Sequence, residues 1–398
     1  MSGALIKTDV AIVGAGLVGL AAALVFHLAG YEVVLVDAQQ AQQANNDSAD
    51  WDQRIYAISP KNAQWLMHLG AWQLLDANRI TEMQAMEIWG DATTKPLQLF
   101  AEDANADGLG FIVEERALKH ALMQKLQDCG VRTIYGQACA AIETSIQCAR
   151  LQLKNQSVIQ STLLLAADGA NSWIRRQLGI AVHEKPYDQT AIVANFIAEK
   201  SHGSIARQWF TQDASGHIGI MAWLPLPDNT VSIVWSASTQ HAETLLKLET
   251  DAFTQQVMAV GDSILGEFKL ISVPAAFPLI LKKADQMVKK SVVLIGDAAH
   301  RIHPMAGQGV NLGFRDVIDL LDTLSEKHQF QNVSDAGLLA HYERMRKADL
   351  LSMTTLTNGL YHLFDSQSGV LKKVRNQGLI ATNQRMLKKL LVTNAIAI

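Results

Sequence analysis

Apolar residues follow two different periods along this chain. Two short stretches, 9–13 and 32–36, are apolar after their first residue and flank a longer stretch at 16–29 that is rich in alanine and leucine. This order predicts a strand, a helix and a second strand. Apolar residues alternate with polar ones further along the chain, which predicts antiparallel strands at 190–198, 206–211, 217–225 and 230–237. We therefore expect an α/β unit combined with an antiparallel sheet.

Composition indicates a globular protein of about two domains. The chain has 398 residues, of which 49% are hydrophobic and 18% charged, and its formal net charge is −4. This balance excludes a generally basic surface for nucleic acid. The three cysteines, Cys129, Cys139 and Cys148, form no CxxC pair. We therefore expect no disulfide framework and no zinc ribbon, and a reducing, cytoplasmic location.

An apolar run near the N-terminus, residues 10–26, has the length of an export signal. Asp9 precedes the run, and three glycines interrupt it at a spacing for which a signal peptide has no use. No other run approaches the roughly 20 apolar residues that span a bilayer. We expect a protein that is soluble or peripheral to a membrane.

The three glycines, Gly14, Gly16 and Gly19, form a G-x-G-x-x-G motif between the first strand and its helix. The first permits a tight turn, the second lets a dinucleotide diphosphate approach the helix N-terminus, and the third lets helix and strand pack closely. Asp37 ends the second strand, where a carboxylate can bind an adenosine ribose. The motif leaves NAD and FAD both open. Because no second copy follows, we expect one dinucleotide.

Two further segments repeat the order of strand, turn and helix. Each strand ends in an aspartate next to a glycine: Asp168-Gly169 after residues 163–167, and Gly296-Asp297 after residues 292–295. Asp297 stands at the carboxyl end of its strand, where open α/β sheets bind ligands. An aspartate that caps the following helix is the alternative for Asp297, and both roles can hold at once.

At these three segments the sequence resembles the FAD-dependent aromatic hydroxylases of the para-hydroxybenzoate hydroxylase type. It is most similar to their ubiquinone-biosynthesis branch, the polyprenylphenol and benzoquinol hydroxylases, because residues 303–313, HPMAGQGVNLG, reproduce that branch's flavin-site pattern. The similarity extends to residues 54–59, 69–72, 277–279 and 342–344. It implies one noncovalent FAD, NAD(P)H as co-substrate, and O2 that is activated at flavin C4a and transferred to the ring.

The resemblance also assigns residues to the flavin site. It implies that Asp297 binds the ribityl chain, that Arg54 reaches the flavin, and that the start of the helix near residue 309 stabilises anionic reduced flavin. The candidate cofactor residues are Gly14, Gly16, Gly19, Asp37, Arg54, Arg116, Asp168, Gly169, Gly296, Asp297, Ala306, Gly307, Gln308, Gly309, Val310 and Asn311. Pro304, Gly307 and Gln308 would surround the flavin ring, and no acid–base catalyst is identified.

One position departs from the family's pattern. Some relatives carry an arginine and this branch carries Val-Glu-Asn where the present chain reads Val113-Glu114-Glu115-Arg116. Either Glu115 or Arg116 can take the flavin-facing place, and a solvated helix start explains both residues equally well. We take Arg116 as the candidate.

Two histidines, His300 and His303, stand three residues apart. Zinc sites need at least three protein ligands, and no third ligand is near in the sequence. We therefore predict no metal centre and interpret His300 as a buried, hydrogen-bonded imidazole beneath the flavin loop.

The alternating strands supply candidates for substrate contacts. The resemblance implies that their sheet covers the substrate, and Trp209, Met221 and Trp223 can line a pocket for an apolar ring and its tail. Packing in the core of the sheet is the alternative for each residue, and it is the more common role of such side chains.

The C-terminal residues 370–398 carry six basic side chains and no acidic one. A basic amphipathic helix can rest on anionic lipid, which suits a substrate that lives in the membrane. A helix that packs against the protein or forms an oligomer, with its lysines in solvent, explains the pattern equally well.

These features predict a Rossmann-like α/β FAD-binding domain with an inserted antiparallel-sheet substrate domain and a C-terminal helical tail. The expected bounds are 1–75, 100–184 and 277–345 for the FAD-binding domain, 76–99 and 185–276 for the substrate domain, and 346–398 for the tail. The expected function is hydroxylation of a polyprenylated phenol or quinol. The alternatives are a flavin-dependent reductase or oxidase of a lipid, and a non-catalytic flavoprotein subunit of a biosynthetic complex.

Overall fold

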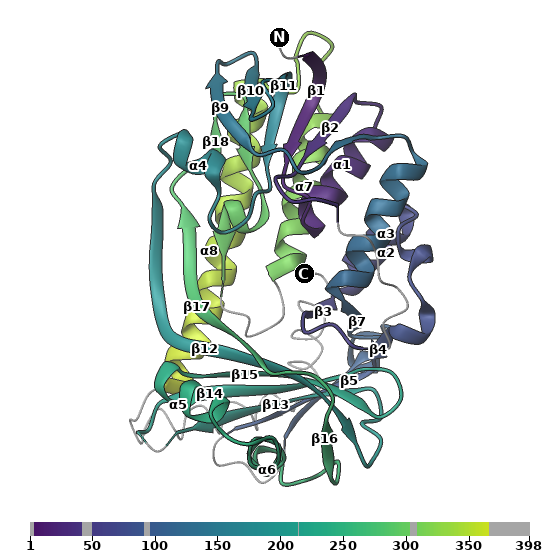
Figure 1. Cartoon of the computed structure of the whole chain (residues 1–398), viewed down its shortest axis with the longest axis vertical. Coiled ribbons are helices and arrows are strands. Elements are labelled where there is room, and N and C mark those ends of the chain that lie inside the picture. Colours follow the sequence, from purple (N-terminus) through teal and green to yellow (C-terminus); the bar gives the residue numbers. More distant parts are fainter. Residues whose placement is uncertain (1–3, 42–49, 91–95, 214, 303–308, 366–398) are drawn as a thin grey trace.

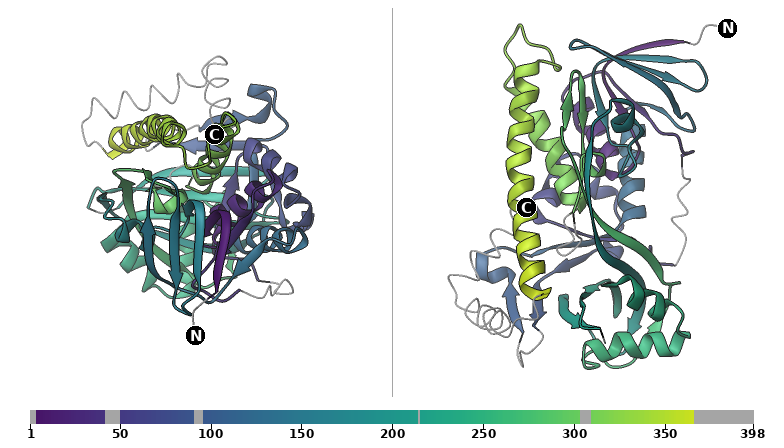
Figure 2. Two further views of the ribbon diagram at one scale, coloured as in Figure 1. Left: turned by 90° about the horizontal axis from the view of Figure 1, so that it is seen from above. Right: turned by 90° about the vertical axis from the view of Figure 1, so that its left-hand side faces the viewer.

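The computed structural model describes residues 4–41, 50–90, 96–213, 215–302 and 309–365. This part of the chain forms an elongated molecule with an α/β part at one end and a large antiparallel sheet at the other (Figure 1). Helix α8 (Ala336–Asp365) runs along one side from the α/β part toward the sheet (Figure 2).

The α/β part is built on an eight-stranded sheet with a parallel centre. Strand β1 pairs in parallel with β2 on one side and with β11 on the other. Strands β8 and β19 continue the parallel order, while β9 and β10 form an antiparallel extension of β11. The central strands are apolar without alternation because both faces of the sheet are covered. The eight strands are β1 (Leu5–Val13), β2 (Val33–Val36), β8 (Arg132–Ile134), β9 (Cys139–Thr144), β10 (Ala149–Leu153), β11 (Val158–Ala166), β18 (Val288–Lys289) and β19 (Val292–Leu294).

Helices pack on the faces of this sheet and form a hydrophobic core together with it. Helix α1 (Leu17–Leu28) is buried along most of its length, because the sheet lies on one side of it and α3 and α7 pack on the other. Helix α8 in turn packs on α7. The other helices of this part are α2 (Pro60–His68), α3 (Glu115–Asp128), α4 (Trp173–Gln177) and α7 (Gly309–Ser325).

The second large sheet has nine strands in the order β20-β17-β12-β15-β14-β13-β5-β6, with β16 added to β12. Helices α5 (Thr239–Leu246) and α6 (Thr250–Val260) lie on its outer face (Figure 1). The nine strands are β5 (Ala85–Trp89), β6 (Leu97–Phe100), β12 (Val182–Ala198), β13 (Ile205–Gln212), β14 (Ile218–Pro225), β15 (Thr230–Ser238), β16 (Phe268–Leu270), β17 (Ala275–Ala284) and β20 (His300–Arg301).

The two parts are joined by long strands and by a small third sheet. Strands β12 and β17 pair over much of their length and run from the α/β part into the nine-stranded sheet (Figure 1). The small sheet, in the order β3-β7-β4, lies beside this junction. Its strands are β3 (Ile55–Ile58), β4 (Thr81–Met83) and β7 (Gly110–Glu114).

The predicted fold class is confirmed, since a parallel-centred α/β sheet is combined with a mainly antiparallel sheet, in which β5 and β13 alone pair in parallel among the described strands. One predicted boundary is not a structural break. Helix α8 continues through residues 345 and 346, because its sequence contains no proline that would end it there. Most of the predicted tail, residues 366–398, lies outside the described residues.

Candidate active site

The G-x-G-x-x-G loop joins β1 to α1 with the geometry that its spacing predicts. Gly14 has φ +108°, and a Cβ there would lie 2.3 Å from the carbonyl oxygen of Ala167. A Cβ on Gly19 would lie 1.9 Å from the carbonyl oxygen of Gly14. A Cβ on Gly16 would meet nothing within 4 Å, and no side chain caps the N-terminus of α1. Gly14 and Gly19 therefore serve close packing, whereas Gly16 borders open space.

Asp37 stands at the end of β2 and holds the same loop. Its Oδ2 accepts a hydrogen bond from the Ala15 N–H at 2.5 Å, and its Oδ1 accepts one from the Gln39 N–H at 2.7 Å. The carboxylate thus fixes the backbone of the glycine loop, a structural contact that the spacing of the motif does not reveal.

The Asp168-Gly169 turn lies against the glycine loop. The Ala167 N–H donates to the Val13 carbonyl at 2.8 Å. Asp168 Oδ2 accepts from the Ile174 N–H at 3.0 Å, so the carboxylate caps the start of α4. Its Oδ1 is buried, with no hydrogen-bond partner among the described residues. The turn needs glycine because Gly169 has φ +79°.

The third segment, Gly296-Asp297, forms a short 3-10 turn after β19. Gly296 has φ +57° and packs against Val18 of α1, which also contacts Gly313 of α7. The Asp297 side chain is open to solvent. The surrounding protein nevertheless desolvates it and raises its pKa, against the opposing effect of nearby positive charges. The Asp297 carboxylate is therefore accessible to a ligand although the protein desolvates it in part.

A buried charge network fixes this turn from behind. Asp316 of α7 accepts hydrogen bonds from the Gly296 N–H at 2.8 Å, from His300 Nε2 at 2.7 Å and from Arg346 Nε at 2.8 Å. Burial alone would raise the pKa of Asp316, but His300 and Arg346 outweigh burial and hold it below the ordinary value. The interpretation of His300 as a buried, hydrogen-bonded imidazole is confirmed.

The sequence did not single out this network as a unit. Asp316 and Arg346 are both fully buried, on helices α7 and α8, among mostly apolar neighbours. Buried charges occur in pairs, so an aspartate and an arginine on packed helices are a signal of such a network. Asp316 and Arg346 lie 30 residues apart on different helices, so the sequence alone does not show that they pair with each other.

The N-terminus of α7 carries the last described members of the predicted set. Gly309 is exposed, and Val310 is packed into the core. The Asn311 amide is bonded within the protein: its Oδ1 accepts from the Ser59 N–H at 3.0 Å, and its Nδ2 donates to the Ala57 carbonyl at 2.8 Å. The Asn311 side chain thus ties α7 to β3 and α2. Pro304, Ala306, Gly307 and Gln308 lie outside the described residues.

Arg54 lies at the start of β3, where the small sheet meets the junction. Its Nη1 is 3.1 Å from Glu115 Oε2, and its guanidinium lies 5.7 Å from the centre of the Phe277 ring. Arg116 points elsewhere, toward the Asp50 carbonyl at 2.7 Å, because successive residues of a helix face different directions. We therefore replace Arg116 by Glu115 in the candidate site.

The prediction of substrate contacts through Trp209, Met221 and Trp223 is wrong. All three side chains are buried in the core between the nine-stranded sheet and helices α5 and α6. The Trp209 and Trp223 rings lie 4.5 Å apart, and Phe268 packs against Trp223 at 4.9 Å. Alternation predicts a strand correctly, but it does not say which layer each face of the strand meets.

The opposite, inner face of this sheet meets the α/β part. Asn195 of β12 donates from Nδ2 to the Asp52 carbonyl at 2.9 Å. Directly opposed residues of neighbouring strands share a face, and register aligns Asn195 with Ser232 and Ser232 with Leu224. The same face carries other partly exposed apolar side chains, namely Val234, Ala222 and Phe210.

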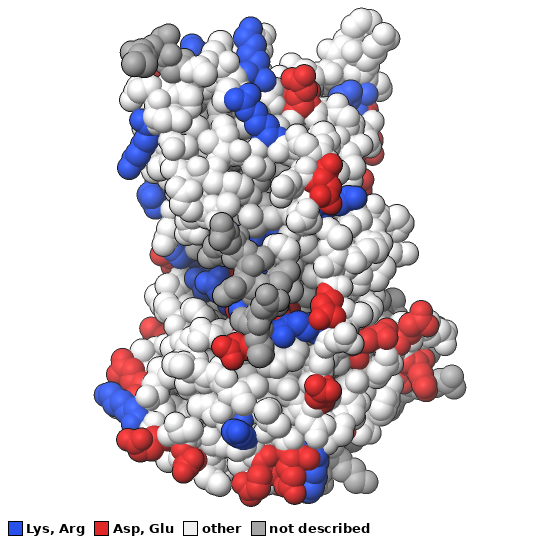
Figure 3. All heavy atoms as spheres, turned by 45° about the vertical axis from the view of Figure 1, so that its right-hand side comes forward, with Lys and Arg blue, Asp and Glu red and all other residues white. Residues whose placement is uncertain are grey.

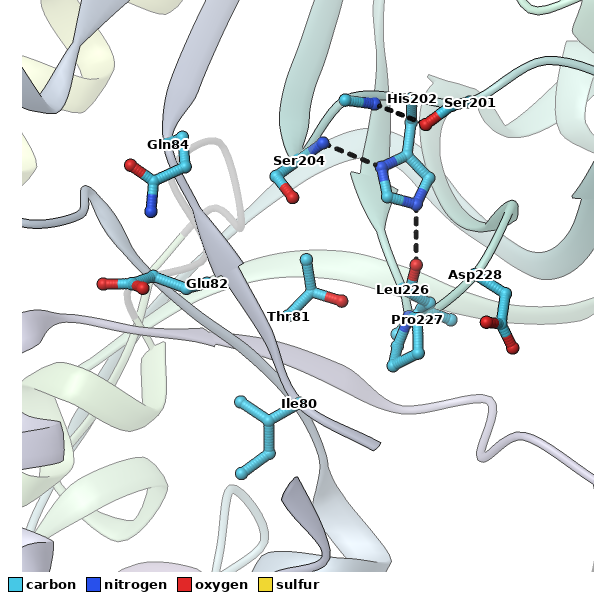
Figure 4. A pocket seen from close by; sticks show the side chains of 11 residues that line it. Ile80, Thr81, Glu82, Gln84, Ser201, His202, Ser204, Leu226, Pro227 and Asp228 are labelled. Carbon is cyan, nitrogen blue, oxygen red and sulfur yellow. Dashed lines mark hydrogen bonds between the residues drawn. The ribbon is translucent and has the colours of Figure 1, made fainter. Parts of the chain in front are cut away.

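A cavity of about 440 Å³ lies away from these loops, between β4 and the turn after β14. His202 borders it, with Nε2 bonded to the Leu226 carbonyl at 2.7 Å and Nδ1 accepting from the Ser204 N–H at 3.0 Å (Figure 4). Burial lowers the pKa of His202. Both ring nitrogens are thus engaged by the protein, and we assign this histidine a structural role.

The geometry of the loops fits an FAD. Open space borders the uncapped N-terminus of α1, a buried Asp168 oxygen lacks a partner among the described residues, and the Asp297 carboxylate is accessible to solvent. A diphosphate suits the first feature, and hydroxyl donors suit the carboxylate. Lys, Arg, Asp and Glu side chains all lie on the surface where the α/β part meets the nine-stranded sheet (Figure 3).

Comparison with known proteins identifies this architecture. A family model described as an FAD binding domain matches residues 7–356. The chain is 33% identical to the 3-demethoxyubiquinol 3-hydroxylase of Escherichia coli over 95% of both chains. It is 31% identical to the human mitochondrial ubiquinone biosynthesis monooxygenase COQ6 over 94% of this chain and 89% of the relative.

Solved structures agree on the fold. The p-nitrophenol 4-monooxygenase PnpA of Pseudomonas putida has a TM-score of 0.76 at 15% identity, with 99% of this chain and 98% of that chain covered. Klebsiella pneumoniae HpxO, solved with FAD and uric acid, has a TM-score of 0.73 at 15% identity, with 97% of each chain covered. The chain therefore belongs to the FAD-binding-domain family, in the ubiquinone-biosynthesis branch of the FAD-dependent aromatic hydroxylases.

Proposed function

We propose that this enzyme hydroxylates the aromatic ring of a polyprenylated phenol or quinol in ubiquinone biosynthesis, with FAD, NAD(P)H and O2. The observation that carries the proposal is the near full-length similarity to two named hydroxylases of this pathway. The alternatives, a lipid reductase or a non-catalytic subunit, have no comparable support from the named relatives.

In this proposal three loops hold the FAD. The N-terminus of α1 beside Gly16 binds the diphosphate, the Asp168-Gly169 turn supports it, and Asp297 accepts hydrogen bonds from ribityl hydroxyls. Asp37 lies at the strand end where an adenosine ribose is expected. The bound FAD supplies the chemistry that activates oxygen, and the protein supplies orientation and exclusion of water.

The substrate ring lies in this proposal against the inner face of the nine-stranded sheet. Leu224, Val234 and Phe210 are partly exposed there and offer apolar contact, while the helix-covered face is filled by its own core. An apolar wall suits a prenylated ring, because each buried methylene favours binding by about 0.8 kcal/mol.

Contact with a membrane is a further part of the proposal. None of the described helices is both long and apolar enough to cross a bilayer. The six basic residues of 370–398 would instead dock on anionic lipid. Replacing Lys372, Lys373, Lys388 and Lys389 by glutamine should then release the protein from anionic liposomes. A changed elution volume on a sizing column, with lipid binding retained, would favour an oligomer contact instead.

Mass spectrometry of a single reaction tests the activity. Purified protein is supplied with FAD, NADH or NADPH, isotopically labelled O2 and a prenylated demethoxyquinol. We expect a product that is heavier by one labelled oxygen atom. Oxidation of NAD(P)H with release of peroxide and no labelled product would favour a reductase or oxidase. A deletion strain that accumulates one quinone intermediate would then identify the ring position.

A further inference from the structure

One glutamine, Gln208 of β13, interrupts an apolar row on the inner face of the nine-stranded sheet. Directly opposed residues of neighbouring strands share a face, and register places Gln208 between Ala222 of β14 and Ile88 of β5. The row continues through further apolar residues on other strands, namely Val234, Val193 and Ala275 beyond Ala222, and Leu97 beyond Ile88. Gln208 is therefore the one polar side chain in this row of described residues.

The Gln208 amide has no hydrogen-bond partner in the part of the chain that the structure describes, although the residue is only 6% exposed. Its oxygen and nitrogen are not sealed off either, in contrast to Asn195 Oδ1 on the same face, which is fully enclosed without a partner. The neighbours Ala222, Ile88 and Phe210 are partly exposed. The amide therefore borders space on the inner face that these neighbours leave open.

A second buried glutamine shows how such an amide is ordinarily satisfied. Gln189 of β12 is 5% exposed, and its Nε2 donates a hydrogen bond to the Ile218 carbonyl at 2.6 Å. Buried side-chain amides are generally bonded in this way, because an amide that leaves water without gaining a partner destabilises the fold. At Gln208 the protein supplies no such partner among the described residues, so a ligand has to supply it.

We propose that Gln208 hydrogen-bonds an oxygen substituent on the aromatic ring of the substrate and thereby fixes the place of the ring on the sheet. This inference rests on the proposed function and names a substrate-binding residue for it. A polyprenyl chain carries no hydrogen-bonding group, so only the ring oxygens can pair with an amide. The amide both donates and accepts hydrogen bonds, which suits a phenolic hydroxyl. The apolar residues on either side of Gln208 then contact the apolar parts of the same molecule.

A single polar contact in an apolar wall sets specificity. A ring that lacks the bonded oxygen leaves the Gln208 amide without a partner, so the site discriminates against it more strongly than an apolar wall alone can. A ring that is held by one oxygen also has fewer orientations on the sheet. Gln208 thus restricts which ring carbon is presented for hydroxylation.

Isothermal titration calorimetry of the FAD-loaded, oxidised protein tests this proposal. The probes are 2-geranylphenol and geranylbenzene, which differ by one ring hydroxyl, and without NAD(P)H neither is turned over. Wild type should bind 2-geranylphenol about tenfold more tightly than geranylbenzene. Gln208→Leu and Gln208→Met should lose this preference and bind the two probes with dissociation constants within about twofold of each other.

Gln189→Leu is the matched control, because it removes a buried amide that the protein itself bonds. It should lower the unfolding temperature and keep the preference for 2-geranylphenol, whereas Gln208→Leu should leave the unfolding temperature unchanged or raise it. The proposal is overturned if both Gln208 variants keep the preference, if wild type has none, or if Gln208→Leu loses as much stability as Gln189→Leu. In each of these cases binding of the probes by wild type leaves the proposed substrate face standing. Wild type that binds neither probe would overturn that face as well.

Discussion

The glycine loops of the α/β part and the outer face of the nine-stranded sheet are packed in opposite ways. At Gly16 the backbone of α1 ends beside open space, where the described residues place no atom within 4 Å of an added Cβ. On the outer face of the sheet, Trp209, Trp223 and Phe268 fill the volume beneath α5 and α6. The large aromatic side chains of the predicted substrate domain therefore stabilise the fold, whereas the glycine loop leaves room for a ligand.

The largest expected effect is a loss of stability after a substitution in the packed core on the outer face of the sheet. Trp223→Ala removes a fully buried side chain from the outer core of the sheet and should lower the free energy of unfolding by about 3–5 kcal/mol. Chemical denaturation measures this change. The matched variant is Leu224→Ala, the next residue along β14, whose side chain lies on the inner face.

Leu224→Ala should cost less stability and weaken the binding of a prenylated substrate instead, by about tenfold or more. If Trp223→Ala leaves stability intact and Leu224→Ala leaves substrate binding intact, the assignment of the two faces of this sheet is wrong.

A second effect concerns the charge network behind the Asp297 turn. Asp316→Asn removes the buried carboxylate that pairs with His300 and with Arg346 Nε, while Asp319 and Asp349 still bond Arg346 Nη1, and should lower the free energy of unfolding by about 3 kcal/mol. Asp319→Asn is the control, because its carboxylate is 35% exposed and bonds the same arginine. Thermal unfolding compares the two variants. Equal losses would show that Asp316 has no special place in the network.

A third effect distinguishes Gly19, which packs against the backbone, from Gly16, which borders open space. Gly19→Ala forces a Cβ against the Gly14 carbonyl and should lower stability by about 1–3 kcal/mol. Gly16→Ala meets no protein atom within 4 Å, so it should fold normally but bind FAD less tightly. A melting curve and an FAD titration on both variants distinguish the roles. Normal FAD binding by Gly16→Ala would contradict the N-terminal part of the site.

Local patterns predicted much of this fold and site, and their limits are physical. Gly14, Gly16 and Gly19 could be assigned from sequence because each acts through backbone geometry within one turn. The partner of Asp316 could not, since Arg346 approaches it from another helix. The roles of Trp223 and Glu115 depend on which way a strand or a helix start faces, and this orientation is set by tertiary packing.

The smallest effect concerns His202, in the loop between β12 and β13. Burial lowers its pKa, so the unfolded chain takes up a proton first and stability is lost as the pH falls below the ordinary histidine value of about 6.5. The loss is at most about 1.4 kcal/mol per pH unit. His202→Asn should show a smaller fall in unfolding temperature between pH 7.5 and 5.5 than wild type.

Asp297 is the residue on which the proposed FAD site depends most, and one titration tests its role. FAD is added to apo-protein of wild type and of Asp297→Ala, with melting curves to show that both fold. Losing a charge-assisted hydrogen bond costs about 1.5–3 kcal/mol, so the dissociation constant should rise by about tenfold to a hundredfold while the unfolding temperature of the apo-protein stays similar. A dissociation constant equal to that of wild type would contradict the proposed site.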